Sequence, residues 1–281
     1  MLYNRRRFLA TTAALATGAA VGARSVQAAY DQSRFPGFKV GIQSYSLRGF
    51  DVDKAIEISE NLGLAHMEFY GKHFPVDSTA DQIAAMKKKM KDAGMEMLGH
   101  GVNRFTADHA KNEKLFKFAK AAGIKNLSAD PSADSFDSLD KLCAKYDVRI
   151  AIHNHGPSHH YNTALDVYNA VKDRHPNIGA CADLGHFIRS GEDPVELIRL
   201  LKGRLFGIHL KDFADQKDKT HGVFLGKGHL DVEGVFRALR LVEFPADGCL
   251  SLEYEENPKD PVADIKECFE IASDACKKSA K

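Results

Sequence analysis

Four ionisable side chains with the chemistry of metal ligands each follow a short apolar segment: His153, Asp183, His209 and Glu253. Two imidazoles and two carboxylates suit a divalent first-row ion such as Mn, Co, Zn or Fe(II), whereas calcium and magnesium prefer oxygen ligands almost alone. We therefore predict one divalent metal ion held by these four residues, and no organic cofactor. His155 lies two residues beyond His153 on the same face of a strand, so it is an alternative ligand.

Other polar side chains stand at equivalent places, directly after apolar segments. A single histidine at such a place is more often a hydrogen-bonded loop residue than part of a site. The prediction therefore depends on the large number of polar residues at these places. We predict that the residues that bind substrate are Gln43, Tyr45, Glu68, His100 and His186, and that Lys211 joins the catalytic group. The fourth apolar segment ends in Ser128 and Asp130.

The elements that must position these residues alternate between short apolar runs and amphipathic stretches, which is typical of a parallel sheet with crossover helices. The amphipathic stretch 52–62 has apolar residues at a period near 3.6, and glycines such as Gly63, Gly94 and Gly123 follow predicted helices. The predicted strands cover residues 39–45, 66–70, 95–100, 124–128, 149–153, 178–182, 205–210 and 249–254. Eight such units predict an α/β fold, a single (β/α)8 TIM barrel over residues 29–281.

A doubly wound sheet is the competing architecture for alternating strands and helices. It would usually have fewer strands and a glycine-rich phosphate turn after the first strand. The sequence Gly41-Ile42-Gln43-Ser44-Tyr45 has no such turn. In a barrel, the carboxyl ends of the strands form the face at which catalytic residues gather, so we expect the polar residues named above to meet there.

The first 28 residues read as a removable export signal. Arg5-Arg6-Arg7-Phe8-Leu9 precedes an apolar stretch over residues 10–21 and a small-residue end at Val26-Gln27-Ala28, which resembles a twin-arginine signal. The apolar stretch is shorter than the roughly 20 residues that span a bilayer. We therefore predict a periplasmic protein with no membrane contact after removal of the signal.

Net charge and cysteine content narrow the class of protein further. The predicted signal contains four arginines and no acidic residue, so its removal changes the formal net charge from +1 to −3. A slightly acidic surface disfavours general binding to nucleic acid. The five cysteines are scattered, with no CxxC pair, so we expect no essential disulfide framework.

Motifs at the predicted strand ends resemble those of the xylose-isomerase-like barrel superfamily, over residues 38–275. They are Gly41-Ile42-Gln43-Ser44-Tyr45, Asp183-Leu184-Gly185-His186, Gly207-Ile208-His209-Leu210-Lys211-Asp212, Gly226-Lys227-Gly228 and Ser251-Leu252-Glu253-Tyr254. The resemblance implies a metal-dependent sugar enzyme. In its epimerase branch Glu, Asp, His and Glu from strands five to eight hold the ion, and the histidine three residues after the Asp contacts substrate, as His186 would.

The fifth strand departs from that epimerase pattern, because His153 stands where the epimerases have a glutamate. A histidine-rich fifth strand is similar to the inosose dehydratase branch, which removes water next to a ketone. The resemblance implies Glu253 as the base that takes a proton beside a carbonyl and His155 as the acid. His186, Lys211 and Glu68 would orient hydroxyls or support the ligands.

Together these features predict hydration or dehydration of a keto-sugar, as in a 3-keto-sugar hydratase. Export from the cytoplasm argues against sugar phosphates. The alternatives are a ketose epimerase or aldose–ketose isomerase on an unphosphorylated sugar, an apurinic endonuclease, which the acidic surface disfavours, and an exported sugar-binding module without catalysis. The sequence leaves open whether the protein is a homo-oligomer.

Overall fold

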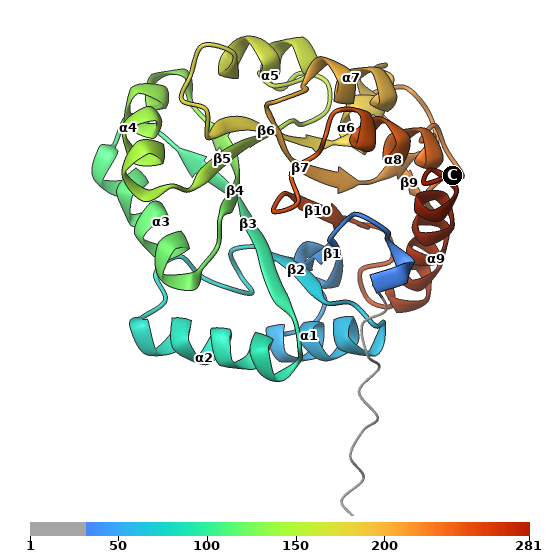
Figure 1. Cartoon of the computed structure of the whole chain (residues 1–281), viewed down its shortest axis with the longest axis horizontal. Coiled ribbons are helices and arrows are strands. Elements are labelled where there is room, and N and C mark those ends of the chain that lie inside the picture. The colour runs from blue at the N-terminus through green and yellow to red at the C-terminus, as the bar shows by residue number, and fades with distance from the viewer. Residues whose placement is uncertain (1–31) are drawn as a thin grey trace, which may run out of the picture.

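The computed structural model describes residues 32–281, so the predicted export signal lies outside the described residues. Eight parallel strands close into one barrel, in the order β1-β10-β7-β6-β5-β4-β3-β2. Figure 1 looks along this barrel and shows the helices arranged around its outside. The predicted (β/α)8 fold is confirmed.

The barrel strands match the eight predicted segments. They are β1 (Val40–Gln43), β2 (His66–Phe69), β3 (Glu96–Phe105), β4 (Asn126–Pro131), β5 (Arg149–His153), β6 (Ile178–Asp183), β7 (Leu205–Leu210) and β10 (Cys249–Leu252). The predicted bounds of β5 and β7 are correct to the residue, and β3 runs beyond its predicted end. A small antiparallel pair, β8 (Asp212–Phe213) and β9 (Gly222–Val223), was not predicted, because two-residue strands are too short to show alternation.

Helices follow the strands around the barrel. They are α1 (Val52–Asn61), α2 (Ala80–Asp92), α3 (His109–Ala122), α4 (Phe136–Tyr146), α5 (Ala164–Val171), α6 (Leu184–Arg189), α7 (Pro194–Leu200), α8 (Val232–Leu241) and α9 (Val262–Lys278). Local sequence sets their ends: Thr79 and Gln82 form a capping box at the start of α2. Gly123 ends α3 in the left-handed conformation, with φ of 79°, as predicted.

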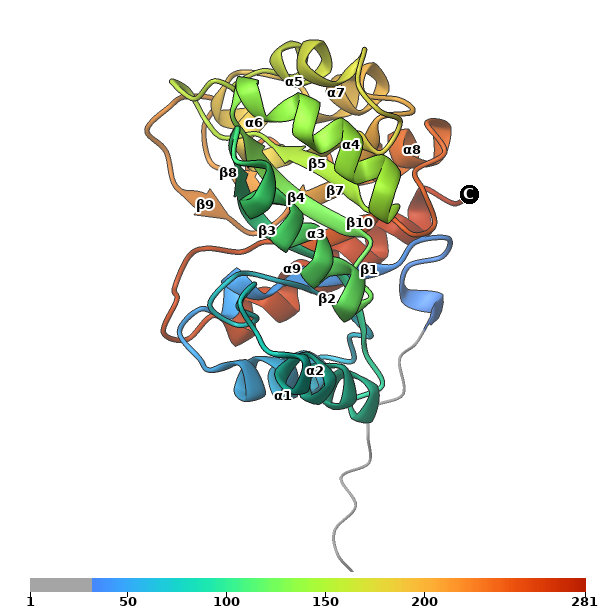
Figure 2. The ribbon, with the colours of Figure 1, turned by 90° about the vertical axis from the view of Figure 1, so that its left-hand side faces the viewer.

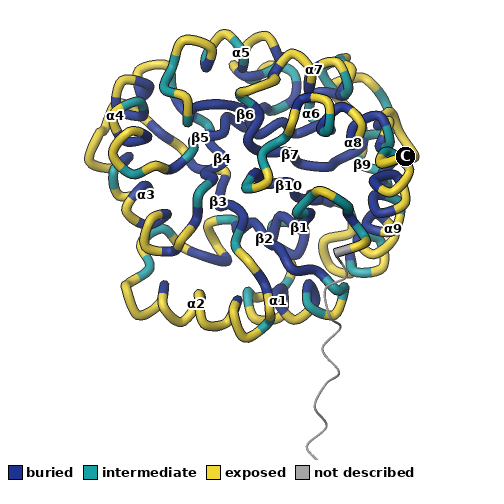
Figure 3. Tube along the Cα trace, in the orientation of Figure 1, coloured by how far each residue is buried: buried dark blue, intermediate teal, exposed yellow. Residues whose placement is uncertain are grey.

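The core lies between the barrel and the helices and also fills the barrel. Figure 3 shows buried strands at the centre and exposed positions on the outer faces of the helices. Large side chains such as Phe35, Phe236 and Phe269 are fully buried, and each contributes roughly 1.5–3 kcal/mol through burial. All five cysteines are buried and free. Among the described residues, no helix has the length and apolarity needed to cross a membrane.

The amino end of the barrel is tied together by Asp247, which lies just before β10. Its carboxylate accepts hydrogen bonds from Lys125 Nζ and Arg149 Nη1, both at 2.7 Å. Asn126 Nδ2 donates to the Asp247 carbonyl oxygen at 2.8 Å. These contacts join the starts of β4 and β5 to β10 at the far end from the predicted site. Partial burial alone would raise the pKa of Asp247, but the bonds from Lys125 and Arg149 outweigh it and lower the pKa.

We expect Asp247→Asn to lower the free energy of unfolding at pH 7 by about 1 kcal/mol, because the carboxylate is half exposed and screened, and the Tm by roughly 2–4 °C. An acid with a lowered folded pKa stabilises the fold above its unfolded pKa and loses this contribution as the pH falls through the folded pKa. The difference in Tm should therefore shrink below about pH 4. Thermal melts at several pH values measure it, with the exposed Asp77→Asn as control.

Candidate active site

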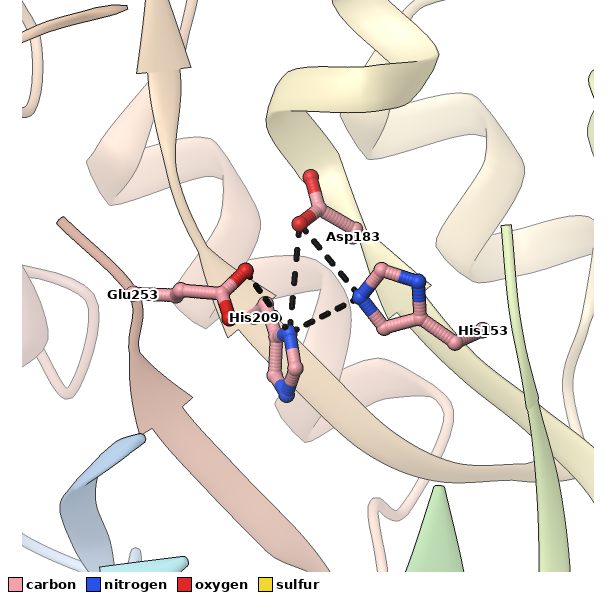
Figure 4. Close-up of side chains that lie close together, drawn as sticks. All are labelled: His153, Asp183, His209 and Glu253. Carbon is pink, nitrogen blue, oxygen red and sulfur yellow. Dashed lines mark hydrogen bonds and ion pairs between the residues drawn. The ribbon is translucent and has the colours of Figure 1, made fainter. Parts of the chain in front are cut away.

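The four predicted ligands come together at the carboxyl ends of four neighbouring strands. Figure 4 shows His153, Asp183, His209 and Glu253 pointing toward one another. One ligand atom from each lies within 4.8 Å of the others, and all four side chains are buried. His209 Nδ1 is 3.0 Å from His153 Nε2, 3.3 Å from Glu253 Oε2 and 3.8 Å from Asp183 Oδ2. The donor set and the converging atoms fit a divalent first-row ion.

His209 is aimed at this cluster by a buried carboxylate beneath it. Its Nε2 donates to Glu68 Oε2 at 2.9 Å, which leaves Nδ1 facing the other three residues. Glu68 also accepts hydrogen bonds from Ser128 Oγ at 2.8 Å and from Cys249 Sγ at 3.3 Å. A carboxylate behind a metal-ligating imidazole fixes its tautomer and raises its basicity. Glu68 therefore positions His209 from below the mouth of the barrel. The prediction from sequence placed it at the mouth, in contact with substrate.

Asp183 is held by both its side chain and its backbone. It ends β6 and caps α6, because its Oδ1 accepts the N–H of His186 at 2.8 Å. Its Oδ2 is thereby turned toward His153 and His209. The side chain of Asn154 bonds the Asp183 backbone twice, accepting from N at 2.8 Å and donating to O at 3.0 Å. Asn154, directly after β5, thus positions Asp183 on the neighbouring strand β6, while β5 itself carries His153.

Lys211 lies against the same two carboxylates. Its Nζ donates to Glu253 Oε2 at 2.7 Å and to Asp183 Oδ2 at 3.1 Å, and it also contacts Glu255. Burial disfavours the charged ammonium, but these carboxylates outweigh burial and raise the pKa of Lys211 well above its usual range. Two buried carboxylates, those of Asp183 and Glu253, therefore face one buried ammonium. A divalent cation would neutralise the remaining negative charge.

Two more predicted residues lie beside the cluster. The His155 ring is centred 4.9 Å from that of His153 and 5.7 Å from that of His186. Burial, with the neighbouring His153 and His159, lowers the pKa of His155 to about 4. Burial also lowers the pKa of His186 to about 3, against the opposing pull of Asp183. Both imidazoles are neutral near pH 7 in this state.

A cavity of about 230 Å³ opens next to the cluster. Its walls include the predicted residues His186, Lys211 and Glu253, together with Arg189 and Phe213, which sequence analysis missed. Arg189 stands over the Phe213 ring, 5.5 Å from its centre, and bonds His186 Nδ1 at 3.3 Å. No local pattern marks Arg189, because it lies on an ordinary helix and only the packing of α6 against β8 brings it here.

Asp212 organises the loop that follows the β8–β9 hairpin, and this hairpin lines one side of the cavity. Its buried carboxylate accepts five backbone hydrogen bonds, from residues 213, 226, 228, 229 and 230, at 2.8–3.0 Å. A side chain on Gly228 would collide with the Phe213 carbonyl oxygen, 2.1 Å from the Cβ position. The Gly226-Lys227-Gly228 motif is therefore a close backbone turn around Asp212.

Three residues that were predicted to bind substrate do not line the cavity. The position predicted for His100 is wrong: its ring lies on the outer face of β3 against Phe118, and Nε2 bonds the Phe74 carbonyl oxygen at 2.9 Å. Gln43 uses its side-chain oxygen to accept the Tyr45 N–H at 3.2 Å. Tyr45 packs on Tyr70 at the ends of β1 and β2 and stands outside the walls of the cavity.

Comparison with known proteins agrees with this architecture. The sequence model of the xylose isomerase-like TIM barrel family matches residues 56–271, so the chain belongs to that family. An inosose dehydratase from Clostridium botulinum is 29% identical over 142 residues, which are 45% of this chain and 47% of that protein. The chain thus spans about half the length of the curated relatives it matches most strongly.

Solved structures share the whole barrel. An uncharacterised protein from Parabacteroides distasonis is 30% identical, with a TM-score of 0.65, and the alignment covers 83% of this chain and 97% of that one. An L-ribulose 3-epimerase has a TM-score of 0.69 at 15% identity, covering 86% of this chain and 96% of that one. At that identity the epimerase shows the fold alone.

We expect Glu68→Gln to weaken binding of a divalent ion to the four-residue cluster by about 10–100-fold, because the amide supports the His209 imidazole less well than the carboxylate does. Isothermal titration with Mn²⁺ measures this affinity. Glu96→Gln, which removes an exposed carboxylate near the start of β3, is the matched control. Equal affinities in the two variants would contradict the role given to Glu68.

Proposed function

We propose that this protein is a divalent-metal-dependent enzyme that takes a proton from the carbon next to the carbonyl of a keto-sugar, with hydration or dehydration as the net reaction. The buried cluster of His153, Asp183, His209 and Glu253 beside a small cavity carries the proposal. The named inosose dehydratase relatives support the dehydratase direction. His153 on β5, at the position where the epimerase pattern has one of its two glutamates, supports it further.

The four-residue cluster would hold the metal. When bound, a divalent ion supplies Lewis-acid stabilisation for the negative charge that develops on a carbonyl oxygen during proton removal. Mn, Co, Zn and Fe(II) all suit the donor set, because each accepts mixed nitrogen and oxygen ligands.

Glu253 is the base in this proposal. Burial would raise the pKa of its carboxyl, but Lys211 and His209 outweigh burial and lower it, so the carboxylate is ionised and free to accept a proton. The same contacts make it a weak base. The C–H bond must therefore be made more acidic by charge stabilisation at the carbonyl. The ammonium of Lys211, on the cavity wall, would donate a hydrogen bond to that oxygen or to a neighbouring hydroxyl in exchange for one of its three carboxylate contacts.

In this proposal the hydroxyl that is lost, or the water that is added, lies on the side of the site that carries His153, His155 and His186. His155 stands next to both His153 and His186, so its ring can exchange a proton with a group above the cluster. His186 is held by the Asp183 cap and by Arg189, which fixes its direction at the cavity wall. The positions of a base on β10 and a histidine on β5 suit removal of a proton and a hydroxyl from adjacent carbons.

The cavity narrows the class of substrate. Its volume of about 230 Å³ is below the roughly 300–1,000 Å³ of pockets for drug-sized ligands, which favours a single sugar unit. Glu253, Glu255 and Glu256 line it, against Arg189 and Lys211. This carboxylate-rich lining disfavours a sugar phosphate. We also propose export to the periplasm, because the chain starts with an arginine-rich segment followed by an apolar one. Export likewise disfavours a sugar phosphate as the substrate.

The reaction can be tested directly with metal-loaded protein lacking residues 1–28. Incubation with 3-keto-glucosides or with their 2-hydroxyglycal products in D₂O should show, by NMR, that water is lost or gained. Deuterium next to the carbonyl without a change in formula would instead identify an epimerase or isomerase. Unchanged spectra over the whole set, with the metal in place, would contradict an enzyme of this kind.

We expect His153→Glu to retain a metal ion, because a carboxylate replaces one ligand with another. It should lose hydration or dehydration by about 10²-fold, because the new negative charge lies next to His155, the proposed acid, and a general acid typically contributes about 10²–10⁴-fold. Elemental analysis and the NMR assay measure the two properties separately. Glu253→Gln, which removes the base, should lose activity to a similar extent. A His153→Glu variant with full hydratase activity would refute the importance of the imidazole.

A further inference from the structure

A second group of metal-ligating side chains lies at the mouth of the barrel. It consists of Asp130, His159 and His160, whose ligand atoms are within 4.8 Å of one another. Asp130 Oδ1 is 3.2 Å from His160 Nε2 and 3.6 Å from His159 Nε2. None of the three belongs to the four-residue cluster, and sequence analysis missed both histidines, although four of the eight residues from 153 to 160 are histidine.

The loop that holds these histidines is anchored over the end of β4. Tyr161, the next residue, donates its hydroxyl to the Pro131 carbonyl oxygen at 2.7 Å, directly after Asp130 in β4. The Tyr161 carbonyl oxygen accepts the His155 N–H at 3.1 Å, which ties the loop back to the end of β5. The contacts of Tyr161 therefore hold the segment that carries both imidazoles beside Asp130.

The carboxylate of Asp130 points to a missing partner. Its Oδ1 is shielded from solvent and has no hydrogen-bond partner among the described residues. A buried carboxylate oxygen without a donor is costly, because it has lost water and gained nothing in exchange. The groups that face it most closely are the Nε2 atoms of His159 and His160, which can both serve as ligands to a cation placed between them.

We propose that Asp130, His159 and His160 form a second site for a divalent first-row cation of the zinc type. One carboxylate oxygen and two imidazole nitrogens are a common donor set for such ions, and three protein ligands leave a position open to water or to a hydroxyl of a bound molecule. A bound cation joins the β5–α5 loop to β4. The loop begins at His155, whose ring is 4.4 Å from that of His159 and 4.9 Å from that of His153, so the cation also orders the segment next to the four-residue cluster.

This second site binds more weakly than the buried cluster. The side chains of Asp130, His159 and His160 are 16%, 26% and 54% exposed, so water competes for the cation. His159 Nδ1 also accepts the Tyr161 N–H at 3.2 Å. Ligation through Nε2 requires the proton on Nδ1, so the cation must displace that hydrogen bond.

Equilibrium dialysis of the full chain against Zn²⁺, followed by elemental analysis, tests the site. We expect two zinc ions per chain, with the weaker one bound at least tenfold less tightly. Asp130→Asn and His160→Ala should each lose the weaker ion and keep the tighter one. His229→Ala, which removes an exposed histidine elsewhere, should keep both. Circular dichroism and Tm of the metal-free variants confirm that each is folded.

The outcomes separate this site from the active-site metal. A single zinc that His160→Ala leaves in place overturns the inference. So does a second zinc that Asp130→Asn leaves unchanged, since that ion is then held by surface imidazoles alone. A zinc that is lost in His160→Ala but retained in His209→Ala supports the second site even if the four-residue cluster binds no metal.

Discussion

The structure depends on how a group of buried charges is balanced at the carboxyl end of the barrel. Asp183 and Glu253 are buried beside a single ammonium, that of Lys211, and Glu68 is buried against the imidazole of His209. Isolated ions in such a place would cost many kcal/mol, so each must be paired or hydrogen-bonded. The pairing found here turns Oδ2 of Asp183 and Oε2 of Glu253 toward His209 Nδ1, so a cation bound beside this nitrogen would be stabilised by both carboxylates.

The barrel supplies this arrangement through contacts between neighbouring strands. Asn154, at the end of β5, holds the backbone of Asp183 at the end of β6. Glu68 on β2 reaches across the barrel interior to His209 on β7. Asp212, just after β7, accepts hydrogen bonds from the backbone of the loop that leads to α8. The β8–β9 hairpin, which begins at Asp212, projects beyond the barrel in the side view (Figure 2). The four side chains of the cluster are thus positioned by contacts that come from several strands at once.

The mouth of the barrel is chemically divided. On the side of β7 and β10, carboxylates and Lys211 surround the cavity, and Arg189 and Phe213 form its edge. On the side of β4 and β5, imidazoles follow one another from His153 through His155 to His159. The dehydration proposed above takes a proton from one carbon and a hydroxyl from the next, and this division would supply the two unlike sets of groups that it needs.

The sequence by itself determined the number and order of the strands and the identity of the four side chains that converge, because alternating apolar segments and strand-end polar residues are local patterns. It did not determine where Glu68 and His100 point. The pairing of β2 with β3 shifts register between Met67 and Glu68, and that of β3 with β4 shifts after His100. Side chains alternate along a strand, so a shift of one residue reverses which face a side chain takes. Only the closed barrel therefore decided that Glu68 supports His209 from inside, that His100 packs outward, and that Asp130 meets His159 and His160.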